Sequence, residues 1–313
     1  MVSFILRRLG AGIILIFVVT TITFVLTHEA NVPAARNILG PSATHAQVTA
    51  LTSQLGLDRP LTEQYWSWIS GAFRGDLGTS YFTSQPVAAA MGDRLPVTLS
   101  IVIFASILTL VISTVLGVAS AVRGGALDAA LQAVTVITYV FPGIILGIAL
   151  VFVFAIKLHL VPAIGFTPIE ESIPGWFASA VLPAVVLSIG SIAALSAQVR
   201  GSVVDELGRD YVRTLRSRDI SEASILFKHV LRNAAGPAFT TFSLQFVSMF
   251  GAALFIERIF ALPGFGAFAF TSTISGDLPA MLGVTLFGVG LVVVVNLLVD
   301  LATGWLNPKA RIA

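Results

Sequence analysis

Long uncharged apolar runs alternate with charged segments along this chain. Six runs approach or exceed the roughly 20 mostly apolar residues that a membrane-spanning helix needs. They cover residues 9–26, 97–122, 129–156, 176–199, 234–256 and 278–299. Strands of an outer-membrane barrel would be about ten residues long with alternating apolar positions, and these runs lack that alternation. The pattern predicts an all-α polytopic membrane protein with six transmembrane helices.

Composition supports a membrane protein and excludes several other classes. Apolar residues make up 56% of the 313 residues and charged residues 11%, whereas ordinary soluble domains are about 25% charged. A soluble enzyme is therefore excluded. The net charge of +2 gives no indication of nucleic-acid binding, and the absence of cysteine excludes disulfides and thiolate chemistry.

The positions of the basic residues predict the orientation. Arg7 and Arg8 precede the first run, which is longer than a usual signal sequence and lacks a clear cleavage site, so it predicts an uncleaved first helix. With the N-terminus inside, twelve basic residues lie inside and six outside. Because basic residues favour the cytoplasmic side, we expect both termini to be cytoplasmic.

Residues 28–96 form the longer non-membrane segment, on the outer side. It is rich in aromatic residues, and we expect it to fold as a small outer domain inserted after the first helix. Tryptophan is also enriched at the lipid headgroups. For Trp66 and Trp68, an interfacial position is therefore an equally good interpretation.

Residues 200–235 form a second non-membrane segment, on the cytoplasmic side, with seven basic and five acidic residues. Its apolar residues are spaced for a pair of amphipathic helices: Phe227, Val230 and Leu231 follow i, i+3, i+4 spacing, and Ser221 is a candidate N-cap. The apolar stripes either pack under the protein's own helices or enter a groove of a partner. The pattern alone leaves both possibilities open.

Four motifs resemble those of one family. Residues 210–221 and 229–237 are similar to the EAA loop of ABC importer permeases, in the variant of the dipeptide/oligopeptide/nickel family. Residues 55–61 with 75–80, 257–266 and 307–311 resemble further motifs of that family. The order of the motifs and their sides of the membrane agree with the predicted orientation. The chain most resembles the first permease of the family's pair.

The resemblance implies a type I ABC importer permease architecture and the division of the chain. The implied parts are 1–27 (N-terminus and first helix), 28–96 (extracytoplasmic), 97–199 (helices two to four), 200–235 (coupling loop), 234–256 (helix five), 257–277 (outer re-entrant or interfacial segment), 278–306 (helix six) and 307–313 (cytoplasmic C-terminus). Pro142 and Pro183 would allow bends in helices three and four.

In the family, the EAA loop docks into a cytoplasmic ATPase and transmits its motion. The resemblance implies this role for Arg213, Thr214, Leu215, Arg216, Asp219, Ile220, Ser221, Arg232 and Pro237. Asp219 replaces the family's usual glycine. Glycine fits a left-handed turn there, and aspartate is one of the few other residues that tolerate that conformation, so we expect the turn to persist.

On the outer side, the resemblance implies a contact with the binding protein or an outer gate. The candidate residues are Asp76, Tyr81, Glu257, Pro263, Gly264 and Phe265. Glu257 and Arg258 are adjacent and point apart on a helix, so we expect each to meet the second permease, the binding protein or water.

The chain contains no motif for its own catalysis. It has no phosphate-binding loop, no histidine spacing of a metal site and no nucleophile motif, so we expect no cofactor, metal site or catalytic residue. ATP hydrolysis would belong to a partner.

The expected complex contains a second, different permease, two ATPase subunits and an extracytoplasmic binding protein, in a bacterial or archaeal cytoplasmic membrane. A short peptide is the first candidate cargo; a nickel chelate or an oligosaccharide is an alternative. A self-sufficient ion-coupled carrier is the alternative class, disfavoured because the six runs hold no ionisable core residue. An intramembrane hydrolase is a third alternative class, and the missing nucleophile motifs make it less favoured than the carrier.

Overall fold

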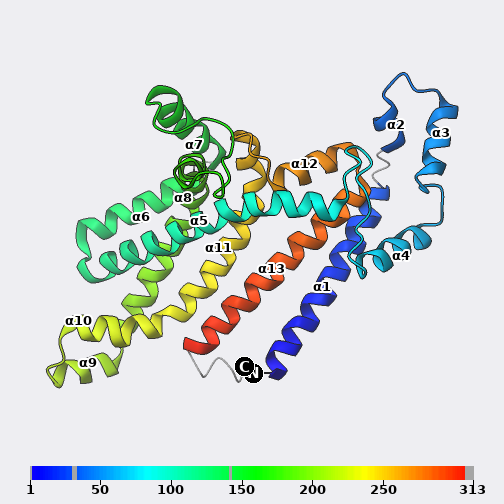
Figure 1. The fold of residues 1–313 in the computed structure, drawn as a ribbon. Helices are drawn as coiled ribbons and strands as arrows, with labels where there is room; N and C mark the ends of the chain where they lie inside the picture. The colour runs from blue at the N-terminus through cyan, green and yellow to red at the C-terminus, as the bar shows by residue number, and fades with distance from the viewer. Residues whose placement is uncertain (1, 30–33, 141–142, 307–313) are drawn as a thin grey trace. The chain divides into compact units, whose positions relative to one another are not determined.

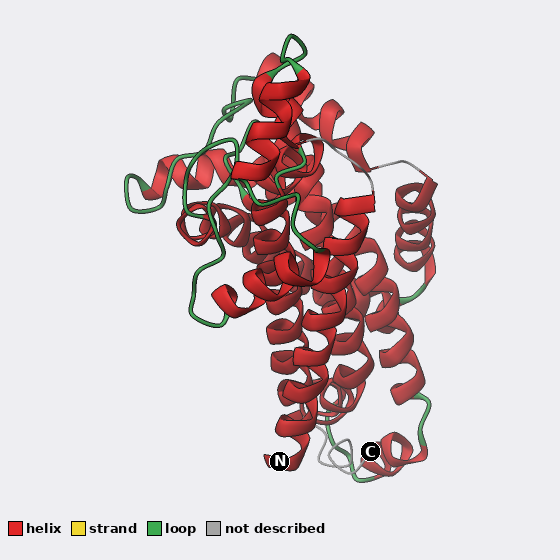
Figure 2. Cartoon of the chain, turned by 90° about the vertical axis from the view of Figure 1, so that its right-hand side faces the viewer, coloured by secondary structure: helices red, strands yellow, loops and turns green. Residues whose placement is uncertain are grey.

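The computed structural model describes residues 2–29, 34–140 and 143–306. Helices make up nearly all of this described part, and Figure 2 draws no strand in it. An isolated bridge pairs Thr79 with Pro86. The predicted all-α fold is confirmed, while Pro142 and the motif at 307–311 lie outside the described residues.

The chain divides into two compact units. The central unit contains Thr98–Leu262 and the end of α13 from Val295, and the flanking unit contains Val2–Val97 and Pro263–Val294. Two long helices, α5 (Val87–Arg123) and α13 (Leu278–Leu306), contribute to both units.

The other elements each belong to one unit (Figure 1). The central unit holds α6 (Gly125–Val140), α7 (Gly143–Leu150), the π-helix η1 (Val151–Lys157), α8 (Ile173–Leu207), α9 (Asp210–Ser217), α10 (Glu222–Ser224), the π-helix η2 (Ile225–Val230) and α11 (Leu231–Ile259). The flanking unit holds α1 (Val2–Glu29), α2 (Ala34–Leu39), α3 (His45–Gln54), α4 (Leu61–Ala72) and α12 (Phe265–Ser275).

Five helical stretches of the described chain are long and apolar enough to cross a membrane. They are Leu6–Glu29, Val87–Arg123, Ile173–Leu207, Glu222–Ile259 and Leu278–Leu301. Each contains one of the predicted runs.

The third predicted run, 129–156, is the exception. Its described residues form α6, which reaches Val140, and α7, which starts at Gly143 and is followed by η1. Residues 141–142 between them lie outside the described residues, so one spanning helix over this run stays a prediction.

In the central unit, α8 packs against α6, α7 and α11. It also approaches α5 closely, because a Cβ added to Gly117 would lie 2.8 Å from the carbonyl oxygen of Ser196. Ser113 of α5 donates a hydrogen bond to the carbonyl oxygen of Ile192 at 3.1 Å. These contacts hold α8, which runs directly into the segment 200–235.

The flanking unit joins the segment 28–96 to α1. α4 lies beside α1, and the hydroxyls of Tyr65 and Thr21 are 2.6 Å apart (Figure 1). The segment 28–96 therefore does not form a unit of its own. It packs with α1, α12 and the beginning of α13, and its last ten residues already belong to α5.

Candidate functional site

A left-handed turn joins α9 to α10. The backbone N–H of Ile220 donates to the carbonyl oxygen of Leu215 at 3.3 Å, and that of Asp219 donates to Arg216 at 3.0 Å. This is the Schellman pattern, which requires a left-handed residue just past the helix. Asp219 has φ = 57°, so the prediction that aspartate keeps the left-handed turn is confirmed.

Ser221 begins the helix after this turn. Its side chain accepts a hydrogen bond from the backbone N–H of Ser224 at 3.4 Å, which confirms the predicted N-cap. A helix stop and a helix start therefore lie within a few residues of each other.

The apolar side of this segment packs mainly onto the protein's own helices. Val212, Ile225 and Val230 are fully buried and belong to one cluster with residues of α8 and α11. The cluster's other buried members are Leu195, Val199, Val203 and Ala234. Leu215 and Ile220 pack against its edge. Of the two interpretations left open by the sequence, packing under the protein's own bundle is therefore the main one.

Phe227 departs from the predicted spacing. Its side chain is 68% exposed, whereas Val230 is fully buried. Residues Ile225–Val230 form a π-helix, whose hydrogen bonds join residues i and i+5. The wider turn moves Phe227 off the buried face that α-helical spacing predicts.

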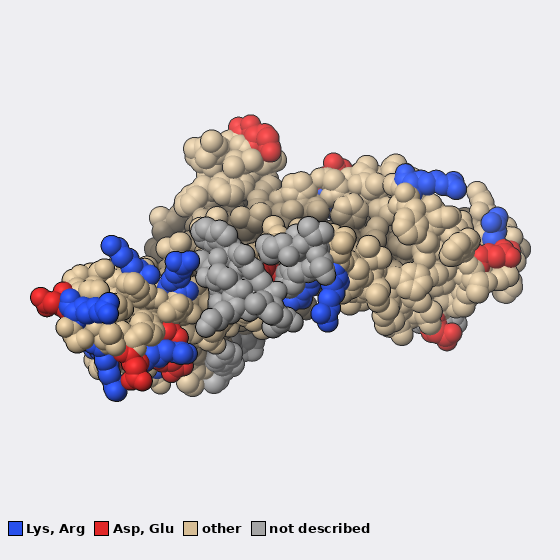
Figure 3. Space-filling model, turned by 90° about the horizontal axis from the view of Figure 1, so that it is seen from below, with Lys and Arg blue, Asp and Glu red and all other residues tan. Residues whose placement is uncertain are grey.

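The opposite side of the segment is charged and open. Arg213, Thr214, Arg216, Asp219 and Ser221 are exposed. Figure 3 shows charged side chains gathered over the end of the central unit that carries α9 and α10. Arg232 and Pro237, in the first part of α11, are exposed as well.

An ion pair closes the turn on this open side. The guanidinium of Arg216 donates two hydrogen bonds to the carboxylate of Glu222, at 2.7 and 3.0 Å. The hydrogen bond from Arg216 lowers the pKa of the Glu222 carboxyl below its ordinary value. The same bond raises the pKa of Arg216. The pair therefore joins α9 to α10 across Asp219 at neutral pH.

A polar group fixes the angle between the end of α8 and α9. Tyr211 donates a hydrogen bond to Glu206 at 2.9 Å, and Asn233 of α11 donates to the Tyr211 hydroxyl at 3.3 Å. Arg209 forms an ion pair with Glu206 at 2.8 Å. Burial, and less strongly the hydrogen bond to Glu206, raise the pKa of Tyr211. The segment 200–235 is thus tied to both helices that leave it.

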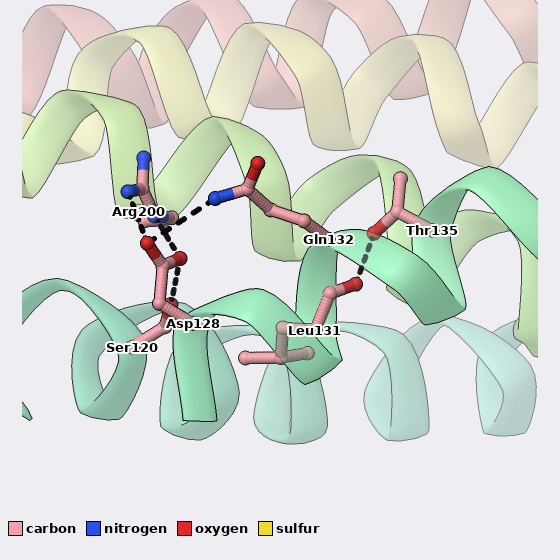
Figure 4. Close-up of polar contacts among 6 residues, drawn as sticks. All are labelled: Ser120, Asp128, Leu131, Gln132, Thr135 and Arg200. Carbon is pink, nitrogen blue, oxygen red and sulfur yellow. Dashed lines mark hydrogen bonds and ion pairs between the residues drawn. The ribbon is translucent and has the colours of Figure 1, made fainter. Parts of the chain in front are cut away.

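A second polar group joins three helices of the central unit, and the sequence analysis did not find it. The carboxylate of Asp128 in α6 receives a two-pronged contact from Arg200 of α8, with Nη2 at 2.5 Å (Figure 4). Ser120 of α5 donates to the same carboxylate at 2.7 Å, and Gln132 donates at 3.2 Å. We call these four residues the Asp128 cluster. Sequence separation hides it, since its charged partners are 72 positions apart.

The central unit also has an uncharged cavity of about 420 Å³ between α7, α8 and α11. Its polar groups are Ser191, Gln245 and Ser248, and its apolar lining includes Leu187 and Phe255. The volume is in the range of small-molecule sites. The sequence analysis named no residue of this cavity, because small and neutral residues in an apolar run give no local signal.

Among the predicted outer residues, Asp76 and Tyr81 lie in the same unit. Asp76 is exposed, and its carboxylate accepts a hydrogen bond from the backbone N–H of Gly78 at 2.9 Å. Tyr81 is half-buried, and its backbone N–H donates to Asp277 at 3.2 Å. Ser80 also donates to Asp277, at 2.5 Å, and both of these side chains are buried.

Asp277 therefore anchors the loop that carries Tyr81 to the turn between α12 and α13. Burial raises the pKa of the Tyr81 hydroxyl to about 12, and the negative charge of Asp277 adds to this shift. The sequence analysis did not name Asp277, although an acidic residue directly before a helix is a recognisable cap signal.

Three of the predicted outer residues are buried within this chain. Glu257 is 1% exposed, and its carboxylate accepts a hydrogen bond from Thr98 in the central unit. Phe265, 5% exposed, and Gly264 are buried in the flanking unit, whereas Pro263 is exposed. The expectation that Glu257 meets another subunit or water is wrong in this structure, because its own chain covers it.

Two family models together match almost the whole chain. The model described as "Binding-protein-dependent transport system inner membrane component" matches residues 113–312. The model of the N-terminal part of such membrane components matches residues 1–102.

Curated relatives match over their full length. The "Probable peptide ABC transporter permease protein y4tP" of Sinorhizobium fredii is 35% identical over 309 residues, which cover 98% of this chain and 99% of the relative. The glutathione transport system permease protein GsiC of Escherichia coli is 32% identical over 313 residues, with 99% of each chain covered.

A solved structure of the methionine ABC transporter MetNI, in an inward-facing conformation, matches with a TM-score of 0.55. The match covers 71% of this chain and 96% of that chain, at 16% identity, so it supports the fold alone. Permeases of this kind are transport subunits that work with an ATPase and a substrate-binding protein, and they are not enzymes themselves. The chain belongs to the family of binding-protein-dependent inner membrane components, the permease subunits of ABC importers.

Proposed function

We propose that this chain is one of two different permeases in an ATP-driven importer of short peptides. It pairs with a homologous second permease, two ATPase subunits and an extracytoplasmic binding protein, with both of its termini in the cytoplasm of a bacterial or archaeal cell. The peptide cargo is supported by the names of the relatives, which transport peptides and glutathione.

The observation that carries this proposal is the two-sided segment around Asp219. One side is buried against α8 and α11, and the other exposes Arg213, Thr214 and Arg216. A partner that moves the exposed side therefore moves two long helices with it, since the buried side has no room to slip. This is the mechanical requirement for transmitting ATPase closure to the membrane.

The uncharged cavity between α7, α8 and α11 is the proposed wall of this subunit's half of the pathway. Hydroxyl and amide groups such as Ser191 and Gln245 can exchange hydrogen bonds with a peptide backbone. A lining without charge holds no peptide side chain strongly, so passage does not depend on the cargo's sequence. Selectivity then belongs to the binding protein.

The test is co-purification of the ATPase with variants of the exposed side. Arg213→Glu combined with Thr214→Glu reverses the charge where a partner docks, and both side chains are exposed, so the fold should tolerate the change. We expect about tenfold or greater loss of bound ATPase, which corresponds to about 1.4 kcal/mol. The second permease should remain bound, because the exchange lies on the cytoplasmic segment.

Thr49→Glu on the exposed side of α3 is the matched control and should retain the ATPase. If the double variant keeps its full complement of ATPase, the coupling role of this segment is refuted. Mass spectrometry of any binding protein recovered with the wild-type complex, and of its bound ligand, tests the peptide cargo separately.

A further inference from the structure

α4 has one side packed into the flanking unit and another side left open. Tyr65 and Trp68 stack on each other, with ring centroids 6.4 Å apart, and Tyr65 also packs on Phe24 of α1 at 5.0 Å. Trp66 is 72% exposed, and Phe73, the residue that ends the helix, is 89% exposed. Trp66 and Phe73 are seven positions apart, which is about two helical turns, so they lie on the same side of α4.

The polar side of α4 faces a cavity of about 260 Å³ within the same unit. Glu63, Gln64 and Ser67 line this cavity, together with Arg59 from the preceding turn. Another side presents Thr62, Trp66, Ile69 and Phe73, which carry no charge; Ile69 is half-buried and the other three are exposed. α4 is therefore amphipathic, and its two most exposed aromatic side chains, Trp66 and Phe73, lie on the uncharged side.

The contact with α1 fixes the depth of α4. Arg7 and Arg8 mark the cytoplasmic end of the apolar part of α1, and about 20 residues counted from Leu9 end at residue 28. Thr21, the partner of the Tyr65 hydroxyl, lies seven residues below that level, or about 10 Å at 1.5 Å per residue.

Apolar side chains of α1 stay exposed between Thr21 and residue 28. Val25 and Leu26 are 44% and 62% exposed, as expected for residues that face lipid. A helix attached at Thr21 therefore lies below the outer limit of the hydrocarbon layer. Amphipathic helices that lie in a membrane surface bury their apolar side by a similar 5–10 Å.

We propose that α4 is an interfacial helix that inserts Trp66 and Phe73 into the outer leaflet of the membrane. The partner is lipid, because both rings are aromatic, uncharged and attached at acyl-chain depth to a helix that itself faces lipid. The aromatic side anchors the flanking unit at a fixed height, which holds the extracytoplasmic segment against the membrane.

Spin labels at single cysteines test this position, because the natural chain has no cysteine. Trp66→Cys and Phe73→Cys are labelled in the full chain reconstituted in phosphatidylcholine vesicles, with Thr49→Cys on exposed α3 as the matched control. We expect the collision rate of both α4 labels with oxygen, which dissolves in lipid, to be several-fold higher than their collision rate with chromium oxalate, which stays in water. The α3 label should show the reverse order.

A second measurement avoids the labels. Phosphatidylcholine with brominated acyl chains should quench the tryptophan fluorescence of the wild type more than that of Trp66→Phe, because Trp66 is exposed whereas Trp68 and Trp176 are half-buried. An α4 that resembles α3 in the collision experiment lies in water and overturns the proposal. Labels shielded from both oxygen and chromium oxalate are covered by protein, which overturns it as well. Neither outcome depends on ATPase coupling.

Discussion

Asp219 occupies a backbone conformation that most side chains avoid. Its φ of 57° lies in the left-handed region, where non-glycine residues generally pay roughly 1–2 kcal/mol. We expect Asp219→Gly to preserve or raise the thermal unfolding temperature of the purified protein. Asp219→Val should lower it, because a β-branched residue fits this region poorly.

Arg218→Ala is the control for the same turn, since Arg218 is exposed and has φ = −93°. It should leave the unfolding temperature nearly unchanged. Equal unfolding temperatures for the glycine and valine variants at position 219 would show that the left-handed geometry carries no cost here.

Tyr81 reports on the anchor that Asp277 provides. Burial and the negative charge of Asp277 raise the Tyr81 pKa to about 12. Removing that charge favours the phenolate, so Asp277→Asn should lower the Tyr81 pKa. The value should stay above 10, because burial is the larger cause and persists.

Ultraviolet absorbance during alkaline titration measures this pKa, and Tyr81→Phe identifies which of the four tyrosines contributes the late step. The titration is read only at pH values where the protein stays folded. A Tyr81 pKa that does not move in Asp277→Asn would mean that the carboxylate does not act on the ring.

At the scale of elements, the Asp128 cluster joins α5, α6 and α8 through one partly buried carboxylate. A two-pronged arginine contact fixes both the distance and the orientation of two helices. We expect Asp128→Asn to lower the unfolding free energy measurably, because it weakens a charged hydrogen-bonded pair and leaves Arg200 without its counter-charge.

A double-mutant cycle with Arg200→Gln measures the coupling. The double variant should lose less unfolding free energy than the two single variants together, since each single exchange leaves one charge without its partner. Additive losses would mean that the two side chains contribute independently. Arg123→Gln, at the exposed end of α5, is the control for removing an arginine near this cluster and should have little effect.

The sequence predicts those features of the elements that depend on neighbouring residues. It does not predict those that depend on residues far apart in the chain. The long apolar runs and the Asp219 turn are local, because helix periodicity and left-handed tolerance are properties of a few adjacent residues. The Asp128–Arg200 contact and the burial of Glu257 depend on residues 72 and 159 positions away. Nothing local in the sequence specifies them.

Phe227 shows a third case, in which the local rule itself changes. The i, i+3, i+4 pattern assumes 3.6 residues per turn, and the π-helix at Ile225–Val230 breaks that assumption. The spacing therefore predicted a buried Phe227 in a place where the chain exposes it.

At the scale of the whole molecule, the orientation in the membrane remains a proposal that rests on charge. The segment 200–235 holds seven basic residues, and charged side chains gather over α9 and α10 (Figure 3). Each charge at the membrane centre would cost about 2.5–3.5 kcal/mol, so this segment does not lie within the bilayer, and its excess of basic residues predicts the cytoplasmic side.

Single cysteines in the cysteine-free chain test this orientation directly. Ser217→Cys on α9 and Thr49→Cys on α3 are both exposed positions, so each thiol is open to reagent. A membrane-impermeant maleimide should label Thr49→Cys in intact spheroplasts and Ser217→Cys only after the membrane is permeabilised. The reverse pattern would place α9 outside the cell, where the membrane separates it from any cytoplasmic ATPase, and would contradict the proposed coupling role.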